Sequence, residues 1–234
     1  MVQSASAKEF FKRKRDFSPF LVHLTKDAVH GGQSVDAIVI LRKILDERTL
    51  KAAHYYCLFQ SDLDKPENAH LHDKFKVVCF TETPIDLIDV LLIEIEERYL
   101  FRPKPYGLVF KKDFIRQHEG GPVFYTTPPL YDGLWRLFMH AKETGFSFAE
   151  NKALALVNKC DEDIDFHWER EWRIVGDLEF TLSDVYCGLC PEEQIKDFET
   201  KYRDVTFIDP SWDINQILDR LVEKQKIEPC DIPF

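Results

Sequence analysis

The chain has 234 residues, of which 44% are hydrophobic, and a formal net charge of −10. Its length and apolar content fit one sizeable folded domain, and its acidic balance disfavours an extended nucleic-acid surface, which usually carries net positive charge. No segment approaches the roughly 20 apolar residues of a membrane span, and residues 1–14 lack the apolar core of a signal peptide. The sequence therefore predicts a cytoplasmic protein with no membrane partner.

The first elements follow a polar, basic lead-in over residues 1–18. Its basic run at 12–15 favours a solvated helix face, with a phosphate-contacting patch as the alternative. An apolar run predicts a strand over 20–24, and apolar residues at helical spacing predict a helix over 35–48. The polar stretch 59–73 is expected to be a loop.

The remaining chain alternates between strands and helices without a regular βαβ order. A strand over 75–80 precedes Thr83 and Pro84, which suit the N-cap and the first turn of a helix reaching about residue 99. Pro103 and Pro105 are expected to interrupt regular secondary structure. Later strands are predicted over 107–110, 123–126, 170–175, 185–189 and 205–208, and helices over 113–117, 134–142, 191–202 and 214–224, the last capped near Ser211. This mixture predicts a single α+β domain over 19–226 with a tail over 227–234.

Two carboxylates at the start of an apolar strand, Glu169 and Glu171, are the strongest candidate for chemistry. Alternation along a strand would point both to one face, and carboxylates near a core are costly unless they are paired or used. The alternative is a surface edge where both acids are solvated and pair with Arg170 or Arg173.

Three shorter features add weaker signals. His23 lies in the predicted strand 20–24, where a histidine is more often a core residue than a catalytic one. The run Cys79 to Pro84 ends a strand before a helix start, a place that suits an anion, although N-capping by a threonine explains it too. Cys187 and Cys190 form a lone Cys-x-x-Cys pair, which cannot close a zinc site by itself, so we expect neither a metal nor a disulfide there.

The order of the segments 20–25, 78–85 and 169–173 resembles the AbiGi-like family of bacterial abortive-infection proteins over most of residues 18–200. More distantly, it is similar to the DarT-like branch of ADP-ribosyltransferases. The second resemblance implies a split antiparallel sheet flanked by helices, and NAD as the cofactor.

The transferase resemblance also implies roles for individual residues. In that superfamily a first strand carries a histidine that contacts the nicotinamide ribose, matched by His23 with Thr25 beside it. A second strand ends in residues that shape the nicotinamide pocket, matched by Phe80 and Thr81. A third begins with the catalytic glutamate, matched by Glu171, with Glu169 two residues before it. Candidates for the arginine that binds the NAD pyrophosphate are Arg42 and Arg48.

The resulting hypothesis is ADP-ribose transfer from NAD to a macromolecule, either nucleic acid or protein, in phage defence or a toxin–antitoxin system. Because the AbiGi-like family has been described as an antitoxin component, the first alternative is a non-catalytic protein that binds and regulates a cognate toxin. The second alternative is a nuclease that uses His23 with the acidic pair.

Overall fold

The computed structural model describes residues 18–30, 32–98, 102–160 and 166–224. The chain packs as two compact units. The first contains the residues up to Arg48, Glu82–Phe114 and the residues from Phe180 onward, and the second contains Thr49–Thr81 and Ile115–Glu179. The predicted basic run at 12–15 and the tail 227–234 lie outside the described residues. The class is α+β, as predicted, whereas the prediction of one domain over 19–226 stays a prediction.

The first unit is built on four strands in the order β13-β12-β6-β1. Its strands are β1 (Phe20–Lys26), β6 (Pro103–Lys111), β12 (Val185–Leu189) and β13 (Phe207–Ile208), with a separate hairpin of β2 (Ala28–His30) and β3 (Gln33–Val35). β6 pairs antiparallel with both β1 and β12, but β12 and β13 are parallel. The predicted split antiparallel sheet is therefore confirmed for β1, β6 and β12 only in their antiparallel pairing, and β13 makes the sheet mixed. α9 (Glu192–Lys201) links β12 to β13 as a crossover helix, which allows parallel pairing.

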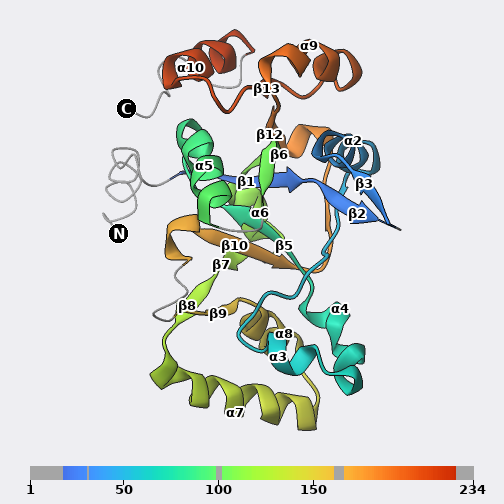
Figure 1. Ribbon diagram of the computed structural model, residues 1–234, viewed down its shortest axis with the longest axis vertical. Coiled ribbons are helices and arrows are strands. Elements are labelled where there is room, and N and C mark those ends of the chain that lie inside the picture. Colours follow the sequence, from blue (N-terminus) through green and yellow to red (C-terminus); the bar gives the residue numbers. More distant parts are fainter. Residues whose placement is uncertain (1–17, 31, 99–101, 161–165, 225–234) are drawn as a thin grey trace, which may run out of the picture. The chain divides into compact units, whose positions relative to one another are not determined.

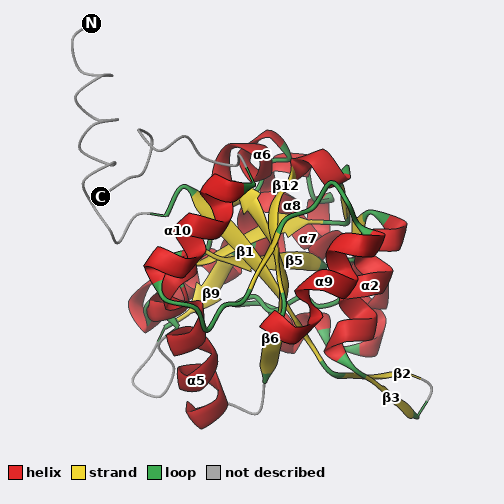
Figure 2. Cartoon of the chain, turned by 90° about the horizontal axis from the view of Figure 1, so that it is seen from above, coloured by secondary structure: helices red, strands yellow, loops and turns green. Residues whose placement is uncertain are grey.

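Helices cover both sides of these strands. α2 (Ala37–Glu47) and α9 lie on one side and α5 (Ile88–Arg98) on the other, as Figure 2 shows. α10 (Ile214–Glu223) follows β13 and is the last element that the structure describes. β6 accordingly buries consecutive residues, Leu108, Val109 and Phe110, because both of its faces are covered.

The sequence predicts that Pro103 and Pro105 interrupt regular secondary structure, but both lie within β6. Pro103 is the first residue of the strand, where a missing N–H costs no ladder bond. Pro105 lies where the pairing with β1 shifts, between Leu24 and Lys26. The strand therefore accommodates both prolines at positions without a regular ladder.

The second unit has a smaller sheet in the order β5-β10-β7. Its strands are β5 (Val77–Thr81), β10 (Glu171–Val175) and β7 (Gly121–Pro122), and two short ladders pair β8 (Phe124–Thr126) with β9 (Val157–Lys159) and β4 (Thr49–Leu50) with β11 (Leu178–Glu179). Its helices are α3 (Gln60–Leu63), α4 (His72–Phe75), α7 (Pro128–Thr144) and α8 (Phe148–Ala155). The residues of α6 (Lys112–Gln117) are divided between the two units after Phe114. In Figure 1, α7 lies beside α3 and α8, and the three helices share one apolar core.

Phenylalanines hold that core together. The rings of Phe59 and Phe138 stack with centroids 4.5 Å apart, and Phe75 meets Phe138 edge to face at 5.9 Å. All three side chains are fully buried. Such ring pairs stabilise a core beyond the area they bury, and here they join α4 and the start of α3 to α7.

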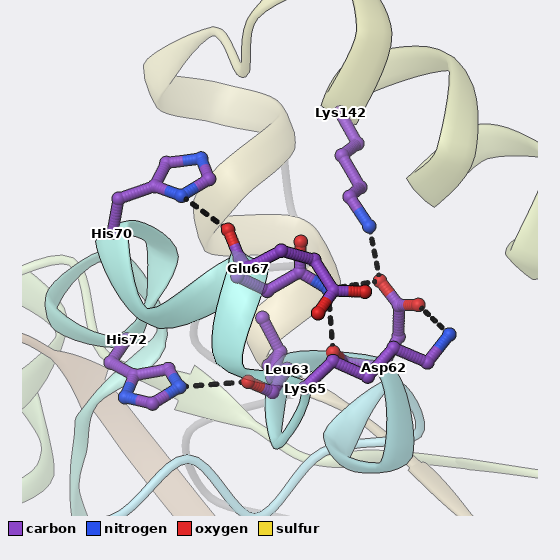
Figure 3. Close-up of polar contacts among 8 residues, drawn as sticks. Asp62, Leu63, Lys65, Glu67, His70, His72 and Lys142 are labelled. Carbon is purple, nitrogen blue, oxygen red and sulfur yellow. Dashed lines mark hydrogen bonds and ion pairs between the residues drawn. The ribbon is translucent and has the colours of Figure 1, made fainter.

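The predicted loop over 59–73 is wrong, because it folds into α3, a 3₁₀ turn over Pro66–Leu71 and α4. The buried carboxylate of Asp62 organises this segment (Figure 3): it accepts hydrogen bonds from Lys65 (2.6 Å), Asn68 (3.0 Å) and Lys142 (2.7 Å). The Nε2 atom of His72 contacts the carbonyl of Leu63 at 2.7 Å. A polar stretch is therefore ordered by a tertiary ion pair that local sequence does not reveal.

The N-cap residues of two helical segments differ from those predicted from the sequence. Pro84, and not Thr83, occupies the N-cap position before the 3₁₀ turn Ile85–Leu87 that leads into α5. α10 is capped by Asp213, whose carboxylate accepts from the backbone N–H groups of Asn215 and Gln216. The predicted strands over 20–24, 107–110 and 185–189, and the helices over 35–48 and 191–202, are confirmed to within a few residues at each end.

Candidate functional site

Pairing of β5 with β10 gathers the polar residues of the second unit on one face. Glu171 lies opposite Thr81, and Arg173 lies opposite Cys79. Because side chains alternate along a strand, these four share one face, while Phe80 points to the other. The structure thus brings Thr81 and Glu171 together, as predicted, but does not bring Phe80 to their face.

The carboxylate of Glu171 is held by the guanidinium of Arg173. The Arg173 Nε and Nη2 atoms donate to Oε1 and Oε2 of Glu171, each at 2.8 Å, and Nη1 donates to the carbonyl of Ala155 at 3.2 Å. Only 1% of Arg173 is exposed. Residues two apart on a strand point the same way, so the arginine reaches its partner within its own strand. A bidentate pair of this kind fixes the orientation of the carboxylate.

Glu169 does not lie in the same strand as Glu171, as the sequence predicted, but in the turn before it. It ends a 3₁₀ turn, His167–Glu169, and Arg170 then takes a left-handed conformation (φ 46°) before β10 begins at Glu171. Strand alternation therefore does not place Glu169, and that part of the prediction is wrong. The turn is fixed instead by the hydroxyl of Thr81, which donates to the carbonyl of Glu169 at 2.6 Å.

The environment of Glu169 changes its titration. Burial, together with the negative charge of Glu171, raises the pKa of the Glu169 carboxyl to about 7, against an ordinary value of 4.5. Arg173 opposes this effect and does not cancel it. The site therefore combines a carboxylate fixed by a guanidinium with a neighbouring carboxyl that changes protonation near neutral pH, which is the range where general acid–base groups work best.

Tyr125 on β8 completes the cluster. Its hydroxyl donates to Glu171 Oε2 at 3.0 Å, and its ring lies 4.8 Å from the ring of His167. Burial and the charge of Glu171 raise the pKa of Tyr125 far above its ordinary value, so the phenol stays a hydrogen-bond donor. Sequence reasoning missed Tyr125, because nothing in the local pattern of residues 123–126 connects it with the acidic pair.

The four other predicted NAD-site residues, His23, Thr25, Arg42 and Arg48, belong to the first unit. Arg48 is the C-cap residue of α2, in a left-handed conformation (φ 53°). The Thr25 hydroxyl is buried and lies 3.2 Å from the carbonyl oxygens of both Ala37 and Tyr106. Arg42 on α2 forms an ion pair with Asp197 and lies over the ring of Phe198. His23 is partly buried on β1.

The predicted cleft would join His23 of the first unit to Glu171 of the second, and it stays a prediction. Within the second unit, Thr81, Glu169 and Glu171 are brought together by the contacts described above. The first unit holds Thr25 and Arg42 through contacts of their own.

Cys187 and Cys190 are buried, reduced thiols of the first unit. Burial raises the pKa of Cys190 to about 12. Among the residues that the structure describes, no group of three or more His, Cys, Asp or Glu side chains is arranged to hold a metal ion. Within the same residues, no helix is both long enough and apolar enough to cross a membrane.

Comparisons of the chain with protein-family models, curated proteins and solved structures found no match. The resemblance to abortive-infection proteins and ADP-ribosyltransferases therefore stays an expectation drawn from short motifs. What the chain does must be inferred from the chemistry of its own residues, above all from Glu169, Glu171, Arg173 and Tyr125.

Proposed function

We propose that the protein transfers ADP-ribose from NAD to a macromolecular acceptor, nucleic acid or protein, using the carboxyl pair of the second unit. One observation carries the proposal: Glu169, whose pKa is about 7, lies near a Glu171 carboxylate that is fixed by Arg173 and Tyr125. Neighbouring carboxyl groups with different environments are typical of enzymes that act on glycosidic bonds.

Each carboxyl group has a role suited to its surroundings. NAD would supply an ADP-ribosyl group whose bond to nicotinamide leaves positive charge on the ribose carbon as it breaks. Glu171, oriented by two hydrogen bonds from Arg173, places negative charge where that positive charge develops. Glu169 accepts the proton of the attacking acceptor group, because its pKa lies near the working pH.

The residues of the second unit fit such a substrate in part. Thr81 and Glu171 share one face, and Glu169 lies beside them. The proposal keeps these three residues. It gives no role at NAD to Phe80, which faces away from Glu171, or to Thr25 and Arg42, whose polar groups already bond within the first unit.

A non-catalytic binding protein, acting as a toxin or antitoxin partner, is the second candidate, and one observation favours it. Both oxygens of Glu171 accept from a buried arginine, and one also accepts from Tyr125. A carboxylate held this way also serves as a structural counter-ion, because an unpaired buried guanidinium is costly. In that case the same cluster stabilises the β5–β10 pair and performs no reaction.

The two candidates differ in a labelling experiment. The full chain is incubated with NAD labelled in the adenylate phosphate and a cell extract, nicotinamide release is followed, and protein, RNA and DNA fractions are counted. We expect one fraction to be labelled, a loss of roughly a hundredfold in Glu169→Gln, and no change in Glu179→Gln, which alters an exposed carboxylate on β11. Neither label nor nicotinamide release from the wild type would favour the binding protein, and strand breakage without NAD would favour the nuclease.

A further inference from the structure

A cysteine and a histidine lie beside the carboxyl cluster and take no part in the proposed transfer. Cys160 directly follows β9, and His167 opens the 3₁₀ turn that ends at Glu169. The Sγ atom of Cys160 lies 3.7 Å from Nδ1 of His167, within hydrogen-bonding range for sulfur. His167 is exposed and Cys160 is partly exposed, so a small reagent in solution can approach the pair.

Neighbouring elements hold both residues in place. The backbone N–H of Cys160 donates to the carbonyl of Thr126 at 2.7 Å, and the carbonyl of Cys160 accepts from the hydroxyl of Tyr131 on α7 at 3.3 Å. The ring of His167 packs on Tyr125 of β8. A thiol and an imidazole fixed at this distance have the arrangement of an activated nucleophile and its base.

Other cysteines of the described chain have the opposite environment. Burial raises the pKa of Cys57 to about 11 and that of Cys190 to about 12, and burial with the charge of Glu171 raises the pKa of Cys79 well above its ordinary value. These thiols are therefore protonated at neutral pH, and Cys57 and Cys190 are also buried, whereas Cys79 is partly exposed. Thiols next to a histidine cation, by contrast, are ionised more readily and react faster.

We infer that Cys160 and His167 form a reactive thiol–imidazole pair that is a modification site for low-molecular-weight disulfides such as oxidised glutathione. The thiolate attacks one sulfur of the disulfide, a new S–S bond forms to Cys160, and the S–S bond of the reagent breaks. The departing thiolate carries away the electron pair and takes a proton from solvent or from His167. The reagent is the oxidant, so the exchange needs no other partner.

The modification would also reach the carboxyl cluster. Cys160 contacts His167, His167 contacts Tyr125, and Tyr125 donates to Glu171, so three successive contacts join a glutathionyl group on Cys160 to the carboxylate. We expect the adduct to lower ADP-ribose transfer. This consequence depends on the proposed function, whereas the thiol exchange itself does not.

The test uses the full chain, oxidised glutathione and iodoacetamide, with modified cysteines identified by peptide mass spectrometry. We expect Cys160 to be modified at pH 7 at least about tenfold faster than Cys57, Cys79, Cys187 or Cys190. His167→Gln should lower the rate at Cys160 at least about fivefold, while His140→Gln, which alters an exposed histidine on α7, should leave it unchanged. Circular dichroism spectra confirm that each variant is folded.

The pH profile of alkylation provides a second readout. Titratable side chains on the elements around the pair include Tyr125, Tyr131, Lys159 and Glu169. The rate at Cys160 should reach its plateau at a lower pH than that of a free thiol in a model peptide, and His167→Gln should move the plateau upward. A peptide-like profile in the wild type, or equal rates in wild type and His167→Gln, would overturn the inference whether or not the protein turns over NAD.

Discussion

Arg173 binds both carboxylate oxygens of Glu171 from within the same strand, with two hydrogen bonds of 2.8 Å. The arginine is among the most deeply buried side chains of the described chain, while 12% of the Glu171 side chain remains exposed. The arginine is therefore enclosed, whereas Glu171, the first residue of β10, keeps part of its side chain exposed. This arrangement suits both an oriented catalytic carboxylate and a structural ion pair, and variants distinguish the two.

The first prediction concerns the anchor. Arg173→Lys keeps the positive charge but loses the planar fork that binds both oxygens of Glu171 and the carbonyl of Ala155. Removing one side of a buried pair typically costs about 3–5 kcal/mol, and retaining the charge should limit the loss to about 2–3 kcal/mol. Urea unfolding measures it, with Arg136→Lys on the exposed face of α7 as the matched control. Equal midpoints for the two variants would show that the pair contributes nothing to stability.

The second prediction is a pH dependence of stability caused by Glu169. Its pKa in the folded protein, about 7, lies above its ordinary value of 4.5, so the folded state binds more protons than the unfolded state between these values. The contribution of Glu169 is therefore fully favourable below pH 4.5 and is lost as the pH rises through 7.

This loss should amount to on the order of 3 kcal/mol at pH 8. Glu169→Gln, which has no charge to bury, should therefore be more stable than the wild type at pH 8 and similar to it near pH 4.5. Glu179→Gln is the exposed control. Thermal unfolding across this range checks the result, and a parallel pH profile for wild type and Glu169→Gln would disprove it.

The third prediction tests whether the Tyr125 hydroxyl orients the Glu171 carboxylate, with the charge of Glu171 left unchanged. Tyr125→Phe keeps the ring beside His167 and removes the hydroxyl that donates to Glu171. A hydrogen bond to a charged group contributes about 1.5–3 kcal/mol, so label transfer from NAD should fall by roughly tenfold while the protein stays folded. Tyr131→Phe, which loses a hydroxyl bonded to the carbonyl of Cys160, is the control and should retain transfer.

The fourth prediction concerns the ion pairs of Asp62. Burial alone would raise the pKa of Asp62, but hydrogen bonds from Lys142 and Lys65 outweigh it and hold the pKa below its ordinary value of 3.8. The stabilising contribution is thus present above pH 3.8 and is lost as the pH falls through the folded pKa. Lys142→Met keeps the apolar stem and should cost about 1–2 kcal/mol at pH 7.

Lys65→Met is the matched control, because the Lys65 ammonium is largely exposed and should matter less. Both variants are compared by urea unfolding at pH 7 and pH 3. If Lys142→Met and Lys65→Met unfold together at pH 7, the link between α7 and α3 is not a source of stability.

The parts of the fold that could be predicted are those set by local pattern. The apolar run at 20–24 indicates a strand and the spacing of apolar residues at 35–48 indicates a helix, because the buried faces of an element set the spacing of its apolar residues. The segment 59–73 could not be predicted, because its helices depend on Asp62 bonding to Lys142, which lies 80 residues away. The strand pattern also places Glu171 beside Thr81, whereas Glu169 reaches them through a 3₁₀ turn and Tyr125 joins from β8, and neither is indicated by local pattern.

The most direct test of the proposed function is nicotinamide release from NAD by the wild type and by Glu171→Gln in the presence of cell extract. Because Glu171 also balances the charge of Arg173, the variant is assayed at a temperature where circular dichroism shows it folded, and Glu169→Gln is assayed beside it. The account predicts release by the wild type, a loss of roughly a thousandfold in Glu171→Gln and a milder loss in Glu169→Gln. Wild-type rates in folded Glu171→Gln, or no release by the wild type with any fraction of the extract, would contradict it.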